Sequence, residues 1–271
     1  MGFGARAPDF RLIPVKIRLH RLRAFASIIA GGLLILAFVG ACSIRGDWRS
    51  ASSEPAGLAP DPAAERDALV QVYAARTWGW RGYFGVHTWV AVKPANADAY
   101  KVYEVIGWRL RSSQSAVVIG GRQPDARWYG NLPELIAEKR GKGVAGIIDR
   151  IDAAAAQYPY PDQYLPWPGP NSNTFTAWLL RAAPELKADL PPTAIGKDYR
   201  GDGFVSSAPI GSGYQLSLRG LLGVAASRVD GLEVNLLGLN FGINPFDASL
   251  KLPLVGRIGP ERRIDTAVVT Q

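Results

Sequence analysis

The chain has 271 residues, a mean hydropathy of +0.01 and a formal net charge of +8. This length allows one substantial domain whose core needs no metal or disulfide support. The basic balance does not indicate nucleic-acid binding, because residues 1–41 hold six Lys/Arg and one acidic residue, and the remainder holds 25 Lys/Arg against 22 Asp/Glu. We therefore expect no nucleic-acid partner.

The N-terminal segment is typical of membrane targeting. Residues 24–41 form an eighteen-residue run without a charge, and a basic region precedes it. This arrangement fits a signal peptide or a membrane-spanning anchor. Because a basic flank stays in the cytoplasm, we expect the rest of the chain on the extracytoplasmic, periplasmic side, with the membrane as a partner.

The end of the apolar run leaves two kinds of anchor open. Residues 39–42, Val-Gly-Ala-Cys, resemble a lipobox, which implies lipid attachment at Cys42 and removal of the signal segment 1–42. The long basic region fits an uncleaved anchor equally well, and an unanchored cytoplasmic chain is the remaining alternative. Residues 43–66 are rich in Ser, Ala, Pro and Gly, which predicts a flexible tether.

Strands dominate the first part of the expected globular domain. Runs of β-branched and aromatic residues separated by turn residues predict four strands in an antiparallel sheet, over 67–73, 86–92, 100–106 and 115–119.

Helices are expected next. Asn131, Pro133 and Glu134 are typical of a helix start, which predicts a helix to about residue 140. Apolar residues at helical spacing predict a second helix over 144–156 and a third that ends before Pro184.

The last third of the chain has a β pattern. Residues 191–213 are loop-like, 214–218 and 232–243 are predicted strands, and a tight turn is expected at Asp230 and Gly231. Apolar residues alternate with Gly and Asn after Leu237, which predicts one buried apolar face. We expect an α+β fold in one domain over 67–258, with a core over about 67–185, a β-rich extension over about 204–258 and a tail over 259–271.

Three short segments carry a resemblance to a known superfamily. A strand that begins His87-Thr-Trp-Val-Ala-Val, a strand containing Val-Tyr-Glu104-Val-Ile, and a helix start with Asn171, Ser172 and Asn173 resemble the circularly permuted papain-like proteins. That group includes lecithin–retinol acyltransferase-like proteins and bacterial cell-wall amidases. The resemblance implies an antiparallel sheet packed on helices, with a nucleophile at the helix start.

The position of the superfamily's cysteine holds Ser172. The resemblance implies Ser172 as nucleophile, His87 as base and Glu104 as the acid that orients the imidazole, with backbone N–H groups of the helix start facing an oxyanion. Each residue also has a structural interpretation, because Ser172 suits a helix cap, a lone strand histidine packs in many cores, and Glu104 suits a solvent face. Longer segments, including Trp-Pro-Gly-Pro-Asn-Ser-Asn, also resemble an uncharacterised bacterial membrane-associated family.

Two functions remain open from the sequence. One is a serine-dependent acyl hydrolase or transferase that acts on an amide or ester of the cell envelope. The other, which loss of the cysteine favours, is a non-catalytic descendant that binds an envelope peptide, glycan or lipid. Candidate ligand-binding residues are Trp89, Trp167, Asn171 and Asn173. No metal site and no cofactor are expected, because the chain has one histidine outside the targeting segment and one cysteine.

Overall fold

A computed structural model describes residues 27, 31–32, 47–260 and 264. The chain divides into the units Met1–Arg45 and Gly46–Gln271, and every element named from β1 onward belongs to the second unit. The predicted anchor run 24–41, apart from three residues, lies outside the described residues, as do Cys42 and most of the tail. Among the residues that are described, no helix is long and apolar enough to cross a membrane.

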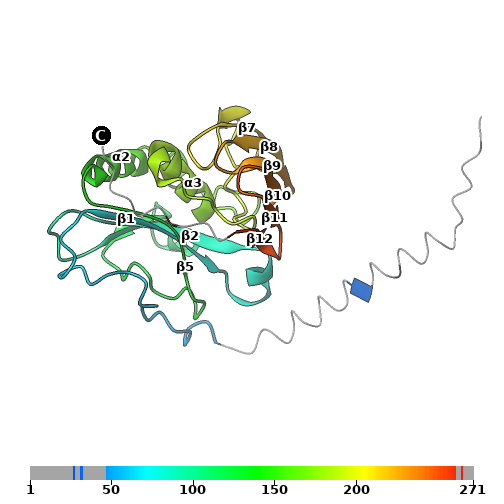
Figure 1. The fold of residues 1–271 in the computed structure, drawn as a ribbon. Coiled ribbons are helices and arrows are strands. Elements are labelled where there is room, and N and C mark those ends of the chain that lie inside the picture. The colour runs from blue at the N-terminus through cyan, green and yellow to red at the C-terminus, as the bar shows by residue number, and fades with distance from the viewer. Residues whose placement is uncertain (1–26, 28–30, 33–46, 261–263, 265–271) are drawn as a thin grey trace, which may run out of the picture. The chain divides into compact units, whose positions relative to one another are not determined.

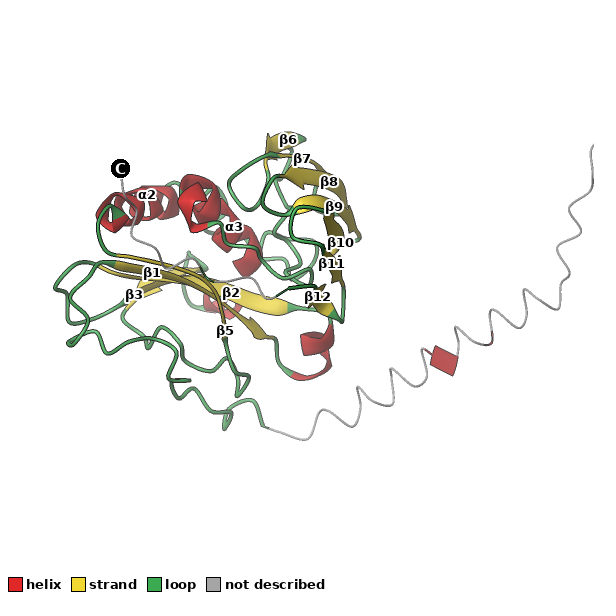
Figure 2. Cartoon of the chain, viewed as in Figure 1, coloured by secondary structure: helices red, strands yellow, loops and turns green. Residues whose placement is uncertain are grey.

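The first layer is a five-stranded antiparallel sheet with the strand order β4-β3-β2-β1-β5. Its strands are β1 (Leu69–Arg76), β2 (Val86–Lys93), β3 (Lys101–Val105), β4 (Val117–Gly120) and β5 (Glu134–Arg140). The four strands predicted from the sequence are confirmed, with bounds shifted by a few residues. Together with two helices they make the predicted α+β fold (Figure 2).

The helix predicted over 131–140 is wrong, because β5 occupies this segment. β5 pairs with the edge of β1, so that Gln71 lies opposite Glu138 and their buried side chains share a hydrogen bond of 2.6 Å. Leu135 and Ile136 pack on opposite faces of the sheet, as successive strand residues do. Pairing with an otherwise open strand edge therefore overrides the local helix-start pattern.

Two helices pack on one face of this sheet (Figure 1). They are α2 (Val144–Ala156) and α3 (Ser172–Ala182), which confirms the second and third predicted helices. The core between helices and sheet includes Ile147 and Ile151 of α2, Phe175 and Leu179 of α3, and Val90 of β2. Short 3-10 turns lie at η1 (Gly79–Tyr83), η2 (Gly107–Arg111) and η3 (Pro184–Leu186).

The opposite face of the sheet is also covered. The described part of the predicted tether, residues 47–66, lies against the domain: Asp125 accepts hydrogen bonds from the N–H groups of Leu58 and Ala59, and the Tyr100 hydroxyl donates to the carbonyl of Pro60. Trp89 and Tyr73 stack beneath this cover. The first sheet is thus buried on both faces.

A second, seven-stranded antiparallel sheet follows in the chain. Its strands run in sequence order: β6 (Val205–Ser207), β7 (Tyr214–Leu218), β8 (Leu222–Ser227), β9 (Gly231–Leu236), β10 (Leu239–Asn244), β11 (Ser249–Leu252) and β12 (Gly256–Ile258). The strand predicted over 214–218 is confirmed. The strand predicted over 232–243 is two strands, because Leu237 and Gly238 both have positive φ, at 53° and 85°, and reverse the chain.

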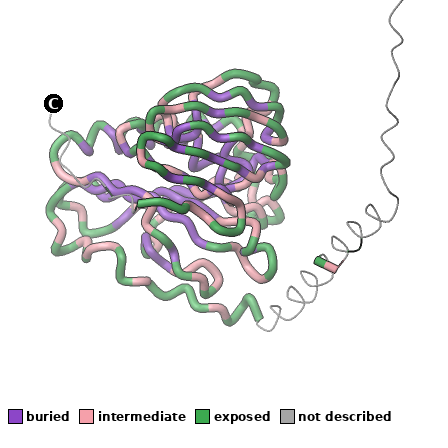
Figure 3. The backbone as a smooth tube through the Cα atoms, turned by 45° about the vertical axis from the view of Figure 1, so that its right-hand side comes forward, coloured by how far each residue is buried: buried purple, intermediate pink, exposed green. Residues whose placement is uncertain are grey.

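The alternation predicted for this region is present, but its direction is the reverse of the prediction. Glu233, Asn235 and Asn240 are buried, whereas Leu232 and Phe241 are exposed. Figure 3 shows buried and exposed residues alternating along these strands. The prediction assumed that the apolar side chains face the core, and the polar side chains do so instead.

Buried ion pairs hold the polar face of the second sheet against the rest of the domain. Glu233 of β9 accepts hydrogen bonds from Lys197 at 2.7 Å and from Lys251 of β11 at 2.6 Å, and Lys251 also binds Asp189. Burial alone raises the pKa of Glu233, but the charges of the two lysines more than offset this and lower its pKa to about 2. Asn235 adds a hydrogen bond of 2.7 Å to Asp198.

We predict that Glu233→Gln lowers the free energy of unfolding by about 3 kcal/mol, because it removes a carboxylate that two buried ammonium groups need. The measurement is urea unfolding at neutral pH. The control is Asp202→Asn, which breaks the exposed Asp202–Arg219 pair and is expected to change stability far less, because solvent screens an exposed pair. Equal effects of the two variants would contradict a structural role for the buried network.

Candidate functional site

The start of α3 carries the three residues singled out from the sequence. Asn171 is the N-cap, and its side-chain oxygen accepts hydrogen bonds from the backbone N–H groups of Asn173 and Thr174, at 2.9 and 3.2 Å. The Thr174 hydroxyl accepts from the N–H of Asn171 at 3.1 Å, which completes a capping box. Two of the N–H groups expected to face an oxyanion are therefore occupied by the cap.

Asn171 and Asn173 also join α3 to its neighbours. The amide of Asn173 donates to the carbonyls of Val86 and Ile195, and its side-chain oxygen accepts from the Thr88 hydroxyl at 3.0 Å. Gly196 packs closely against this start: with φ of +95°, an added Cβ would lie 2.5 Å from the Asn171 amide nitrogen. These contacts give both asparagines a structural role in placing the helix.

His87 lies on the other face of the sheet. Thr88, the next residue of β2, faces α3, so the alternation of a strand directs His87 away from it. The imidazole stacks on Trp128 with centroids 3.6 Å apart and lies 5.6 Å from the ring of Trp89. The structure thus separates His87 from Ser172 by the thickness of the sheet.

Glu104 is brought to His87, as expected from the sequence. His87 Nε2 and Glu104 Oε2 lie 3.1 Å apart, and both side chains are buried. The guanidinium of Arg122 donates to both Glu104 oxygens, at 2.9 and 3.2 Å, and lies 4.8 Å above the ring of Trp89. Arg122 is thus the third member of this cluster.

The cluster keeps its imidazole neutral. Burial lowers the pKa of His87, although the hydrogen bond and charge of Glu104 act in the opposite direction. Burial also raises the pKa of Glu104, but the hydrogen bond from His87 and the positive charges around it prevail and lower it. The result is an ionised Glu104 that pairs with Arg122 and orients an uncharged His87.

The two tryptophans named as candidate ligand contacts are placed differently from each other. Trp89 is fully buried, and its indole N–H donates to the carbonyl of Pro124 at 2.7 Å. Trp167 is 52% exposed and donates to the carbonyl of Leu237 in the turn between β9 and β10. Trp89 is therefore a core residue, and Trp167 links the loop before α3 to the second sheet.

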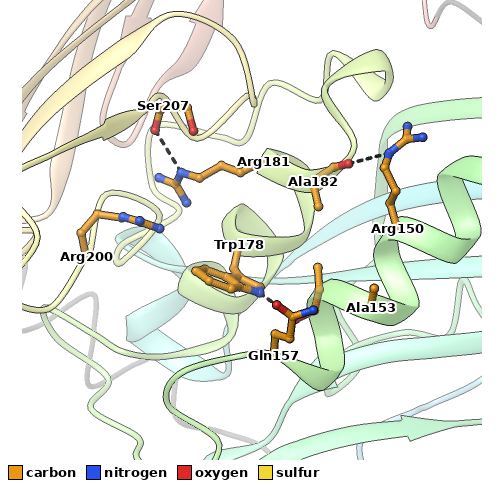
Figure 4. A pocket seen from close by; sticks show the side chains of 9 residues that line it. Arg150, Ala153, Gln157, Trp178, Arg181, Ala182, Arg200 and Ser207 are labelled. Carbon is orange, nitrogen blue, oxygen red and sulfur yellow. Dashed lines mark hydrogen bonds between the residues drawn. The ribbon is translucent and has the colours of Figure 1, made fainter.

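A pocket of about 430 Å³ lies elsewhere, between α2, α3 and the end of β6 (Figure 4). Its walls combine cations with apolar surface, and its lining residues are Arg150, Ala153, Ala154, Gln157, Trp178, Arg181, Ala182, Arg200 and Ser207. None of the lining residues that the structure describes is acidic. We call this the arginine pocket.

The cations of the arginine pocket differ in their partners. Arg150 pairs with Glu185 at 2.6 Å and donates to the carbonyl of Ala182. Arg181 binds only neutral groups, the carbonyls of Ser207 and Lys197 and the side-chain oxygen of Gln215. The buried Nε of Arg200 has no hydrogen-bond partner among the described residues, and its guanidinium lies 5.7 Å from the Trp178 ring.

The charge of Arg181 is poorly compensated. Burial, followed by the nearby positive charge of Arg200, lowers the pKa of Arg181 to about 9, and Asp198 opposes this only in part. A guanidinium is still charged at neutral pH under these conditions. A negatively charged group in the pocket would compensate the positive charge of Arg181. The arginine pocket is therefore chemically suited to an anion.

Among the described residues, one cluster of carboxylates has the geometry of a metal site. Ligand atoms of Asp189, Asp230 and Glu233 lie within 4.8 Å of one another. The ammonium of Lys251 contacts all three, including Asp230 at 3.4 Å. A lysine therefore occupies the position that a cation would take, and this cluster belongs to the buried network that holds the second sheet.

No pattern in the sequence indicates the arginine pocket. Trp178 and Arg181 are three residues apart on one face of α3, Arg150 comes from α2, and Arg200 from a loop. Only their arrangement in the folded chain brings them together, whereas His87 and Glu104 could be paired because neighbouring strands carry them.

Comparison with known proteins finds a similarity for the mixed sheet-and-helix part of the chain. Residues 67–199 match a family model described as a protein of unknown function (DUF3750). This part is thus a domain of unknown function, and the match ends before β6, so that it covers the first sheet and both helices but not the second sheet. Neither the curated proteins nor the solved structures contain a significant match.

We predict that the His87 imidazole titrates below its ordinary pKa of about 6.5, because burial opposes its positive charge. Glu104→Gln is expected to lower this pKa further, since the carboxylate is what favours the charged imidazole. The measurement is an NMR titration of the imidazole C–H signals, assigned with His87→Gln. A pKa at or above the ordinary value would contradict the neutral, buried imidazole.

The lowered pKa also predicts a pH dependence of stability. Below about pH 6.5 the unfolded chain binds a proton that folded His87 does not, so stability falls as the pH decreases. His87→Gln should show a shallower loss of stability between about pH 6.5 and 5 than the unchanged chain.

Proposed function

We propose that this chain is a membrane-tethered binding protein of the cell envelope that keeps a permuted papain-like order of elements without its catalysis. The N-terminal basic region and apolar run support the attachment and the extracytoplasmic position. The histidine strand preceding the Asn-Ser-Asn helix start supports the relation to the permuted papain-like superfamily. The ligand is a small organic anion held in the arginine pocket.

The placement of His87 supports a non-catalytic role. A serine hydroxyl needs a base within hydrogen-bond distance during attack. The side chain of His87 points into the Trp89 and Trp128 layer, and α3 with Ser172 packs on the other face. The N–H groups of Asn173 and Thr174 are used by the cap. Base, nucleophile and oxyanion donors are not assembled in one place.

The single observation that carries the binding proposal is the poorly compensated charge of Arg181 and Arg200 in the arginine pocket. Arg181 has only neutral hydrogen-bond partners, and Arg200 Nε has none among the described residues. Guanidinium groups bind carboxylate and phosphate with charge-assisted hydrogen bonds. The Trp178 ring and the alanines of α2 add an apolar wall, so an anion with an aromatic or aliphatic part fits better than an inorganic ion.

We predict that the protein binds phenyl phosphate more tightly than inorganic phosphate, and that Arg200→Gln weakens phenyl phosphate binding about tenfold through loss of one charge-assisted hydrogen bond. Isothermal titration calorimetry gives the affinities. Among the described residues, the Arg200 side chain makes no hydrogen bond, so its replacement leaves the fold intact. The control, Arg111→Gln, removes an exposed arginine that does not line the pocket. Equal binding by both variants would refute the site.

The serine-hydrolase alternative makes a different prediction. If Ser172 were an activated nucleophile, a fluorophosphonate probe would label it covalently, and Ser172→Ala would abolish the label. We expect no labelling of Ser172 in the folded chain, as read by mass spectrometry of the intact protein and its peptides. Labelling that depends on His87 as well as Ser172 would replace the binding proposal with the enzyme.

A further inference from the structure

The outward face of the second sheet is apolar from one edge to the other. Strand register lines its side chains up in rows that cross neighbouring strands. One row contains Val205, Leu216, Val224, Val234 and Phe241; a second contains Leu218, Leu222, Leu236 and Leu239; a third contains Tyr214, Ala226, Leu232, Ile243, Leu250 and Ile258. No charged residue lies in these rows. We call this surface the apolar sheet face.

The apolar sheet face is accessible and large. Its central residues Val224 and Val234 are each 44% exposed, and Tyr214 is 78% exposed. The seven strands are three to six residues long. At the usual spacings the sheet spans about 29 Å across the strands and about 10 to 20 Å along them, or roughly 300 to 600 Å² in projection. A continuous apolar surface of this size marks an interaction with protein or membrane.

Apolar side chains continue beyond the strands into the turns. Leu237, Leu254 and Val255 are at least half exposed at one end of the sheet, and Phe246 is 72% exposed at the other. A second copy packed face to face would cover the rows of side chains, but it would not account for the apolar side chains in the turns. A lipid surface accounts for both the rows and the turns, because the acyl-chain region is apolar across the whole plane of the bilayer.

The edges of the face have the residues of a membrane interface. Tyr214 and Phe204 lie at the β6–β7 edge, and Trp167 lies beside the turn at Leu237. Arg219 and Arg228, both exposed, lie in turns at opposite ends of the sheet. Amphipathic aromatic rings and arginines are favoured where acyl chains meet headgroups.

The length of the chain before the domain favours the same partner. The apolar run ends at Ala41, and the described part of the second unit begins at Asp47. The five residues 42–46 span about 20 Å when fully extended. If the proposed attachment holds, the domain stays close to the bilayer. The apolar sheet face would then meet lipid before any other partner.

From these observations we infer that the apolar sheet face lies on the lipid bilayer, with its side chains at the boundary of headgroups and acyl chains. The inference rests on the proposed membrane attachment and adds a second, non-covalent contact to it. The buried ion network then acts as the support that presents this face to lipid, because it holds the opposite, polar face of the same strands.

The test measures the depth of single labelled positions in the full chain. Cys42 is kept, because it is the candidate site of lipid attachment, and Val234 on the face or Ala145 on the exposed side of α2 is replaced by p-acetylphenylalanine, whose ketone receives a nitrobenzoxadiazole label. The labelled chains are reconstituted into vesicles of phosphatidylethanolamine and phosphatidylglycerol. We expect the label at 234 to be quenched by nitroxide-bearing lipid and reduced by aqueous dithionite several-fold more slowly than the label at 145.

Other outcomes overturn the inference. Equal reduction by dithionite at both positions, in chains that float with the vesicles, would mean that the face is exposed to water. Protection at 234 without nitroxide quenching, accompanied by energy transfer between differently labelled chains, would mean that a second copy covers it. The same label at position 216 on β7 repeats the test in the same row. Failure to float contradicts the proposed attachment instead, so the two failures are distinguishable.

Discussion

The buried contact between Glu233 and the two lysines Lys197 and Lys251 is the constraint on which the second half of the structure depends. A charge is tolerated in a protein interior only when it is paired and hydrogen-bonded. Here the strands β9 and β11 place their charged and amide side chains inward. These side chains form hydrogen bonds there with Asp189, Lys197 and Asp198. Once these side chains are fixed inside, the period of two along a strand directs the leucines and valines outward.

This inversion links the fold to the proposed function. In a sheet with one face on the core, the inward face is ordinarily the apolar one. The second sheet has a polar inner face satisfied by the rest of the domain and an apolar outer face. The apolar surface therefore follows from the same register that satisfies the ion pairs, and a one-residue slip would bury the leucines but expose Glu233 and Lys251.

The start of α3 shows how a helix cap and a nucleophile position use the same residues. Asn171 places its side-chain oxygen over the first N–H groups of the helix, and Asn173 holds the helix against β2. These contacts fix the geometry of the helix start but occupy the donors that catalysis would need. His87 and Glu104, on the opposite face, are stabilised by Arg122 and by stacking on Trp128. The residues that resemble an active site in the sequence thus lie in two separate clusters.

Local patterns were sufficient for the elements whose residues interact mainly with near neighbours in the chain. The strands β1 to β4, the helices α2 and α3, and β7 were predictable from periodicity, and the pairing of His87 with Glu104 from adjacent strands. The segment of β5 was not, because the edge of β1 outweighs the cap-like residues Asn131 and Pro133. The turn at Leu237 and Gly238 was not predictable either, because the apolar run around it does not indicate that the chain reverses.

The sequence by itself determined that an apolar, positively flanked segment precedes a mixed domain and that polar and apolar residues alternate in its last third. Only the tertiary structure decided which of those alternating residues face inward, because this depends on distant partners such as Lys197 and Asp198. It also decided that His87 and Ser172 lie on opposite faces of a sheet and that Arg181 and Arg200 meet in one pocket. Side-chain direction and long-range contacts are set by packing, which a linear pattern does not contain.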